Sequence, residues 1–292
     1  MRGTCYTAGV ALLAAGALGG CQSRDSDTAT RDSTAAGAQT AAANTPTVNV
    51  TAKDFAFEAP ARVPAGRITM QLVNNGTELH HAQLVRLEEG KTLADLSQAM
   101  KSHGPPPAWL KFVGGPNAVP PGKNSNATAV LEPGRYAYLC FVWGADKVMH
   151  VAKGMVREFE VVDSASSGAS ELPAADITID LRDYDFQLSQ PLTPGRKTFL
   201  VTNSGPQPHE LALIKLAPGK TVEDIARYIE GGMKGAPPGE PIGGVVGLDK
   251  GARGTFSAEL EAGNYGLMCF IPDVKDGKLH LEHGMMKTFK VG

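Results

Sequence analysis

Each half of the chain carries a set of side chains that could bind a soft metal ion. The first set lies in the stretch CFVWGADKVMHVAKGM, from Cys140 to Met155, and the second in CFIPDVKDGKLHLEHGM, from Cys269 to Met285. Both stretches place a thiol, an imidazole and a thioether close together on one loop. Soft sulfur ligands combined with imidazole nitrogens favour a redox-active ion such as copper. The sequence therefore predicts the same chemistry at two places.

The two stretches belong to a longer internal repeat. Four pairs of possible ligands recur at a spacing of 129 or 130 residues: His80 and His209, Cys140 and Cys269, His150 and His280, and Met155 and Met285. A tandem duplication is the simplest explanation of such spacing. The alignment also selects His80 over its neighbour His81, because His209 has no histidine beside it. Each half then has the ligand order His, Cys, His, Met.

Two imidazoles, one thiolate and a weak axial methionine form the ligand set of a blue, or type 1, copper centre. An early His some 60 residues before a close group of Cys, His and Met resembles the cupredoxin family, including its two-domain members. The resemblance implies an all-β chain of two tandem Greek-key β-sandwiches, with up to two type 1 copper ions. The ligands that it implies are His80, Cys140, His150 and Met155, then His209, Cys269, His280 and Met285.

Two features depart from the small electron carriers of that family. Nine residues separate the Cys from the second His in the first copy, and ten separate them in the second copy. Loops of this length look more like the type 1 sites of copper nitrite reductases. Many cupredoxins also have Asn directly after the first His, where this chain has His81 and Glu210. We therefore expect the hydrogen bonds between the two ligand loops to differ.

The ligand set favours outer-sphere electron transfer with redox protein partners, because protein groups would fill the equatorial positions of the ion. A copper buffer or chaperone serving copper acceptors would use the same ligands, and a metal-free interaction module would share the fold. Both alternatives stay open. A nitrite reductase needs a His directly before the type 1 Cys, where Leu139 and Met268 stand, and a multicopper oxidase needs more than the seven histidines present. The sequence therefore argues against an enzyme.

Residues 1–20 resemble a bacterial lipoprotein signal peptide. Arg2 is followed by an apolar run from Ala8 to Leu18, which is too short to span a bilayer, and small residues precede Cys21. Cleavage before Cys21 would leave that residue as a lipid anchor. We expect a protein tethered to the membrane of a bacterial cell envelope, facing the periplasm or the exterior. Ordinary secretion with a free thiol at Cys21 is the alternative.

The composition is that of a globular protein with two domains. The chain has 292 residues, of which 42% are hydrophobic, and a net charge of −2, so nothing basic suggests nucleic acid. Residues 21–46 are polar and lack large apolar side chains, which predicts a flexible tether. A second polar stretch at 164–175 predicts a linker, and so domains at 47–163 and 176–292. The oligomeric state is left open.

The elements of each domain must hold these side chains in place. Alternating, β-favouring residues predict strands at 48–57 and 177–186. Hairpin turns at 132–135 and 261–264 lead into predicted strands at 136–141 and 265–270. Further paired strands are predicted at 68–73 and 198–201, 82–87 and 211–216, and 156–162 and 286–291. Thr92 with Asp95, and Thr221 with Asp224, predict one short capped helix in each copy. The Gly-rich and Pro-rich segments 104–121 and 235–247 predict surface connections, and the alternatives are a cover over the copper site or a docking face for a partner.

Overall fold

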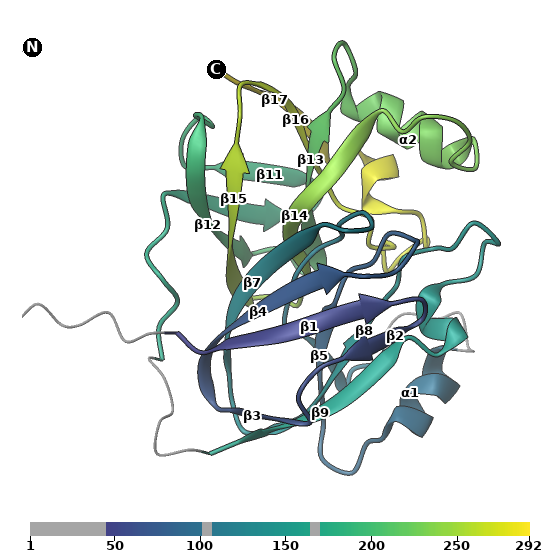
Figure 1. Ribbon diagram of the computed structural model, residues 1–292, viewed down its shortest axis with the longest axis vertical. Helices are drawn as coiled ribbons and strands as arrows, with labels where there is room; N and C mark the ends of the chain where they lie inside the picture. Colours follow the sequence, from purple (N-terminus) through teal and green to yellow (C-terminus); the bar gives the residue numbers. More distant parts are fainter. Residues whose placement is uncertain (1–44, 101–106, 164–169) are drawn as a thin grey trace, which may run out of the picture. The chain divides into compact units, whose positions relative to one another are not determined.

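The computed structural model describes residues 45–100, 107–163 and 170–292 (Figure 1). The signal peptide, Cys21, most of the tether and part of the linker lie outside these residues, as does His103. The first half forms the strands β1 (Thr47–Lys53), β2 (Ala56–Glu58), β3 (Arg62–Pro64), β4 (Gly66–Asn74), β5 (Gln83–Leu87), β6 (Leu110–Phe112), β7 (Asn124–Leu131), β8 (Gly134–Leu139) and β9 (Val156–Val162). The second half forms β10 (Ile177–Arg182), β11 (Asp185–Leu188), β12 (Gly195–Asn203), β13 (His209–Leu216), β14 (Gly239–Leu248), β15 (Arg253–Leu260), β16 (Gly263–Met268) and β17 (Met286–Val291).

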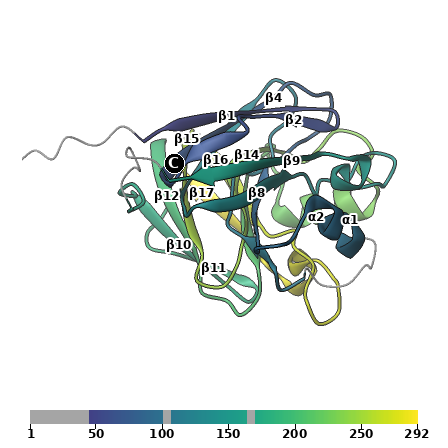
Figure 2. The ribbon, with the colours of Figure 1, turned by 90° about the horizontal axis from the view of Figure 1, so that it is seen from below.

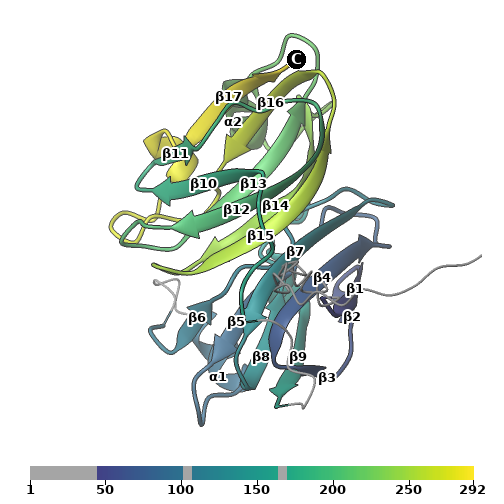
Figure 3. The same ribbon diagram turned by 90° about the vertical axis from the view of Figure 1, so that its left-hand side faces the viewer.

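Each half is a sandwich of two sheets (Figure 3). In the first, strands in the order β2-β1-β4-β7 face strands in the order β3-β9-β8-β5-β6. In the second, β11-β10-β12-β15 face β14-β13-β16-β17. Strands β7 and β15 pair at Thr128 and Thr255, which joins one sheet of each sandwich into a sheet of eight strands. The predicted all-β tandem is confirmed, although the strand expected at 48–57 is a hairpin of β1 and β2.

The strand that precedes each cysteine has two buried faces. Along β8, Tyr136 and Tyr138 point into the core between the sheets, and Cys140 continues that alternation. The intervening Ala137 and Leu139 pack in a second apolar cluster on the outer face of the sheet. Successive side chains of a strand point to opposite faces, so this register directs the cysteine sulfur inward. The same alternation along β16 buries Cys269 in the core of the second sandwich.

The outer faces are covered by the two helices that the sequence predicts (Figure 2). Leu96 of α1 (Leu93–Met100) packs in the outer cluster of the first sandwich, and Ile225 of α2 (Val222–Glu230) in that of the second. Both capping contacts are present: the N–H of Thr92 donates to Asp95, and the N–H of Thr221 to Asp224. Within the described ranges, neither helix is long and apolar enough to cross a membrane.

One expectation about the connections is wrong. The segment 235–247 does not form a surface connection, because most of it is strand β14, which pairs with β13. Its glycines permit a close approach of backbones. Gly244 has a φ of +125°, and a Cβ there would overlap the carbonyl oxygen of Leu211. Glycine is the residue that tolerates both conditions, so a composition typical of loops here marks a crowded strand.

Candidate metal centre

The first site is assembled from three parts of the first sandwich. His80 precedes β5, Cys140 follows β8, and His150 begins the short 3-10 helix His150–Lys153, an element that the sequence did not predict. All three side chains have an exposed fraction of 0%. The His80 and His150 Nδ1 atoms are 3.0 Å apart, and the Cys140 Sγ lies 3.9 Å from the first and 3.5 Å from the second.

This triangle has the dimensions of a metal site. A point in its plane that is equidistant from the three atoms lies about 2.0 Å from each, close to the bond lengths of about 2.0–2.3 Å for imidazole and thiolate ligands. Two imidazoles and one thiolate in a plane suit type 1 copper. His80 lies 60 positions before Cys140, and His150 lies 10 positions after it. The structure brings these three residues, which the sequence selects, into an arrangement that fits a type 1 copper ion.

The second sandwich repeats the arrangement. His209 begins β13, Cys269 follows β16, and His280 begins the 3-10 helix His280–His283. The Nδ1 atoms of His209 and His280 are 3.0 Å apart, and the Cys269 Sγ lies 3.3 Å from the His280 Nδ1. The ligand atoms of all three residues lie within 4.8 Å of one another, and all three side chains are fully buried. The structure thus brings together the same three residue types twice.

The two methionines lie next to these groups along the backbone. In the first sandwich the N–H of Met155 donates to the His150 carbonyl, and the N–H of Cys140 donates to the Met155 carbonyl. Met285 makes the same pair of bonds with His280 and Cys269. Both methionine side chains are fully buried in the cores that contain the cysteines.

Carboxylates orient the histidine rings. Asp54 Oδ1 lies 2.7 Å from His80 Nε2, and Glu78 Oε2 lies 3.0 Å from His150 Nε2. An Nε2–H that donates to a carboxylate leaves Nδ1 unprotonated and directed at the metal. Asp183 makes the equivalent 2.7 Å contact with His209. Sequence reasoning missed these partners, although the match of Asp54 with Asp183 in the repeat was the available signal.

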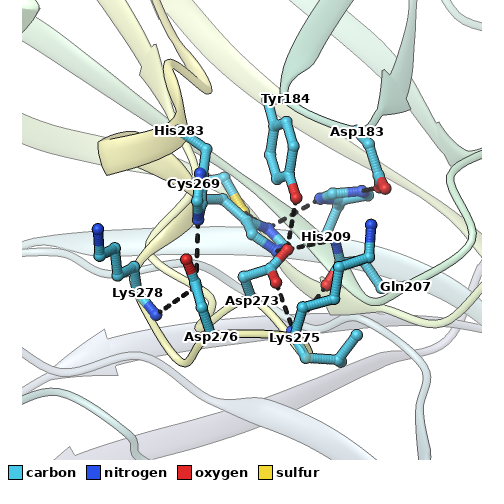
Figure 4. Close-up of polar contacts among 12 residues, drawn as sticks. Asp183, Tyr184, Gln207, His209, Cys269, Asp273, Lys275, Asp276, Lys278 and His283 are labelled. Carbon is cyan, nitrogen blue, oxygen red and sulfur yellow. Dashed lines mark hydrogen bonds and ion pairs between the residues drawn. The ribbon is translucent and has the colours of Figure 1, made fainter.

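The second histidine of each site has different surroundings. Gln207 occupies the position that matches Glu78, and it donates to Asp273 instead of reaching the ring (Figure 4). The His280 Nε2 has no hydrogen-bond partner among the residues that the structure describes, and Asp273 Oδ2 is 3.8 Å away. Tyr184 stands edge-on to the His280 ring and donates to the same carboxylate. Burial, followed by the charge of His209, lowers the pKa of His280 to about 4, which keeps the ring in its neutral form.

The residues after the first histidines tie the ligand loops together. The N–H of Phe141, next to Cys140, donates to His81 Nε2 at 2.8 Å. In the second sandwich the N–H of Phe270 donates to Glu210 Oε1 at 2.9 Å. The side-chain acceptor differs between the two sites, as expected, but the bond between the loops is kept in both.

Both thiols are protonated in the metal-free protein. Burial raises the pKa of Cys140 to about 12 and also raises the pKa of Cys269. Hydrogen bonds from the backbone N–H groups of His81 and Val142 act in the opposite direction on Cys140, because they favour the thiolate. A metal ion that binds the thiolate must therefore displace a proton from each site.

Strand order and buried ligand triangles define two tandem cupredoxin-like sandwiches. Among solved structures, the chain is similar to a reduced auracyanin from Roseiflexus castenholzii, with 23% identity, a TM-score of 0.29, and coverage of 40% of this chain and 98% of that one. It is also similar to a blue copper oxidase from Nitrosomonas europaea (17% identity, TM-score 0.26, coverage 85% and 86%) and to a copper nitrite reductase from the same organism (15%, 0.25, 85% and 94%). No family model and no curated protein matches the chain.

Proposed function

We propose that the chain binds one type 1 copper ion in each sandwich and carries single electrons between redox partner proteins. The observation that supports this most directly is the buried triangle of two Nδ1 atoms and one sulfur, which occurs twice. The distance between the two Nδ1 atoms and the distance from the sulfur to the second histidine are nearly equal in the two sites. Copper supplies one-electron chemistry in such a set. The proposed ligands are those of the repeat: His80, Cys140, His150 and Met155, and His209, Cys269, His280 and Met285.

The surrounding residues favour this role because they hold the ligands still. Asp54 and Asp183 fix the ring of the first histidine in each site, and the acceptors at positions 81 and 210 fix the loop that follows each cysteine. The cysteines themselves extend strands that are paired on both sides. A site whose ligands are held by packing and hydrogen bonds changes little between two oxidation states.

Replacing either cysteine by serine tests the copper sites. We expect Cys140→Ser and Cys269→Ser each to remove about half of the bound copper and about half of the intense visible band, because the thiolate is both a ligand and the origin of that band. Copper analysis and absorption spectra of the full chain measure both quantities. Single variants that keep all copper and the full band would contradict the proposal.

The carrier role has its own readout. Copper that stays bound through repeated reduction and oxidation supports electron transfer, whereas copper that passes readily to an acceptor protein would support the alternative of copper handling. A nitrite reductase needs a His directly before the type 1 Cys. In this chain Leu139 and Met268 hold those positions, and both pack in the outer apolar clusters. Turnover of nitrite by the copper-loaded chain would overturn the assignment as a carrier.

We also propose that Cys21 carries a lipid that tethers the protein to the cell envelope. The support is the sequence alone: an apolar run that ends in small residues before Cys21. The variant Cys21→Ala is expected to move the protein from the membrane fraction to the soluble fraction. Fractionation followed by immunoblotting measures this, and a Cys140→Ser variant that stays in the membrane fraction serves as the control. A Cys21→Ala protein that remains with the membranes would contradict the anchor.

A further inference from the structure

A short segment of the first sandwich, residues 116–119, makes backbone contacts with a proposed ligand at one end and with the second sandwich at the other. At one end, Val119 forms a β-bridge with the ligand His80: its N–H donates to the His80 carbonyl at 3.1 Å, and its carbonyl accepts the His80 N–H at 3.4 Å. At the other end, the N–H of Asn117 donates to the carbonyl of Gly244 in the second sandwich at 3.2 Å. The segment therefore contacts a ligand of one site and the backbone of the other sandwich.

The side chain of Asn117 reaches further into the second sandwich. Its Nδ2 donates to the Leu211 carbonyl at 3.0 Å and to Glu210 Oε2 at 3.3 Å. Asn117 is held in this position by its own surroundings, because its Oδ1 accepts the N–H of Ala118 and its carbonyl accepts the hydroxyl of Ser125. The exposed fractions of Asn117 and Glu210 are 3% and 6%, so this contact is shielded from water.

Glu210 connects that contact to the ligands. It follows His209, and its N–H donates to the Cys269 Sγ at 3.4 Å. Its Oε1 accepts the N–H of Phe270, the residue after Cys269. Asn117 binds the other carboxylate oxygen. One buried carboxylate is thus fixed at one oxygen by the ligand loop and at the other by the first sandwich.

The first site has no equivalent of the side-chain hydrogen bond from Asn117 to Glu210 at the matched positions. The repeat pairs Asn117 with Val246 and Glu210 with His81. The backbone bond is reciprocal, since the N–H of Val246 donates to the Gly115 carbonyl at 3.1 Å. Val246 has no polar side chain, however, and His81 Nε2 accepts the Phe141 N–H within its own sandwich. The first site is therefore completed by its own residues, whereas the second borrows a donor.

We propose that Asn117, a residue of the first sandwich, is a positioning residue for the metal site of the second sandwich. This inference rests on the proposed function, because the site is that of the second copper ion. A buried carboxylate that loses a donor is costly, so Glu210 would turn away and release the backbone after Cys269. The second site thus depends on a side-chain donor from the first sandwich, whereas the first site receives no side-chain donor at the matched position.

The variant Asn117→Val tests the proposal, because valine is the residue at the matched position. In the full chain with Cys140→Ser, copper reports on the second site alone, and we expect Asn117→Val to weaken its copper binding by about 10-fold, the usual effect of losing a partner beyond the ligands. The double variant Asn117→Val, Glu210→His copies Val246 and His81, the residues at the matched positions around the first site, and should restore binding. Hydrogen exchange of the Phe270 amide in the metal-free protein should be faster in the single variant and restored in the double variant.

Asn126→Val is the matched control. Asn126 crosses the same interface, where its Nδ2 donates to the Ser257 carbonyl at 2.8 Å, and it contacts neither ligand group. We expect this variant to leave copper binding and Phe270 exchange unchanged. An Asn117→Val protein with unchanged copper binding and exchange, an equal loss in Asn126→Val, or a double variant as weak as Asn117→Val would overturn the proposal. If no variant and no wild-type chain binds copper, the proposed function fails, while Phe270 exchange still decides the role of Asn117.

Discussion

Replacing Gly76 by alanine is expected to abolish copper binding at the first site and to leave the second site loaded. A Cβ at position 76 would lie 2.6 Å from His80 Nε2 and would overlap Asp54 Oδ1. These two atoms are hydrogen bonded to each other at 2.7 Å, and Asp54 is also held by the N–H and hydroxyl of Thr77. Neither can move without turning the ring of a ligand, so about half of the copper and of the visible band should be lost.

Gly205 provides the reciprocal control, because it holds the matched position in the second sandwich. A Cβ there would lie 2.6 Å from His209 Nε2, so Gly205→Ala should empty the second site and spare the first. Circular dichroism would show that both variants keep the β-sheet fold. Gly76→Ala with both sites loaded, or with both sites lost in a folded protein, would contradict the prediction.

Metal-free wild-type protein is expected to lose stability relative to a Glu210→Gln variant as the pH rises from about 4.5 to about 7, because Glu210 titrates in this range. Burial raises the pKa of this carboxyl from 4.5 to about 7. Between these values the folded protein keeps a proton on Glu210 that the unfolded chain releases, so the contribution of Glu210 to the free energy of unfolding falls with rising pH. The contribution is fully present below pH 4.5 and is lost above pH 7. The gap between the two pKa values corresponds to about 3 kcal/mol.

Glu210→Gln isolates this contribution, since glutamine does not titrate. The free energy of unfolding, measured in urea at several pH values, should decrease in the wild type relative to the variant as the pH rises. The difference between the two proteins should change by about 3 kcal/mol from pH 4.5 to pH 8. A constant offset is expected from the altered contact with Asn117. Burial lowers the pKa of His81 to about 3, an effect that is present in both proteins and cancels. Parallel curves would contradict the prediction.

Much of the metal centre could be predicted from residue order because the repeat supplies an internal alignment. It separated His80 from His81 and matched His150 with His280, and the structure brings those residues to the cysteines. The hairpin turns at 132–135 and 261–264 also predicted the strands 136–141 and 265–270 that deliver the cysteines. These features depend on the order of residues within one copy, which a sequence records directly.

The repeat matches Asp54 with Asp183 but does not show that they contact the histidines, and it gives no signal for the contact of Asn117 with Glu210. Asp54 is 26 residues from His80, and Asn117 is 93 residues from Glu210, so only chain folding brings these atoms together. The glycines of β14 show the same limit. A Gly-rich composition indicates a loop, and only the pairing of β14 with β13 in the structure shows that this segment is a strand. The sequence alone thus identifies the residue types that we propose as metal ligands and their order, whereas three-dimensional packing selects the groups that orient them. Orientation depends on atoms that converge from strands distant in the chain, and no local pattern encodes that convergence.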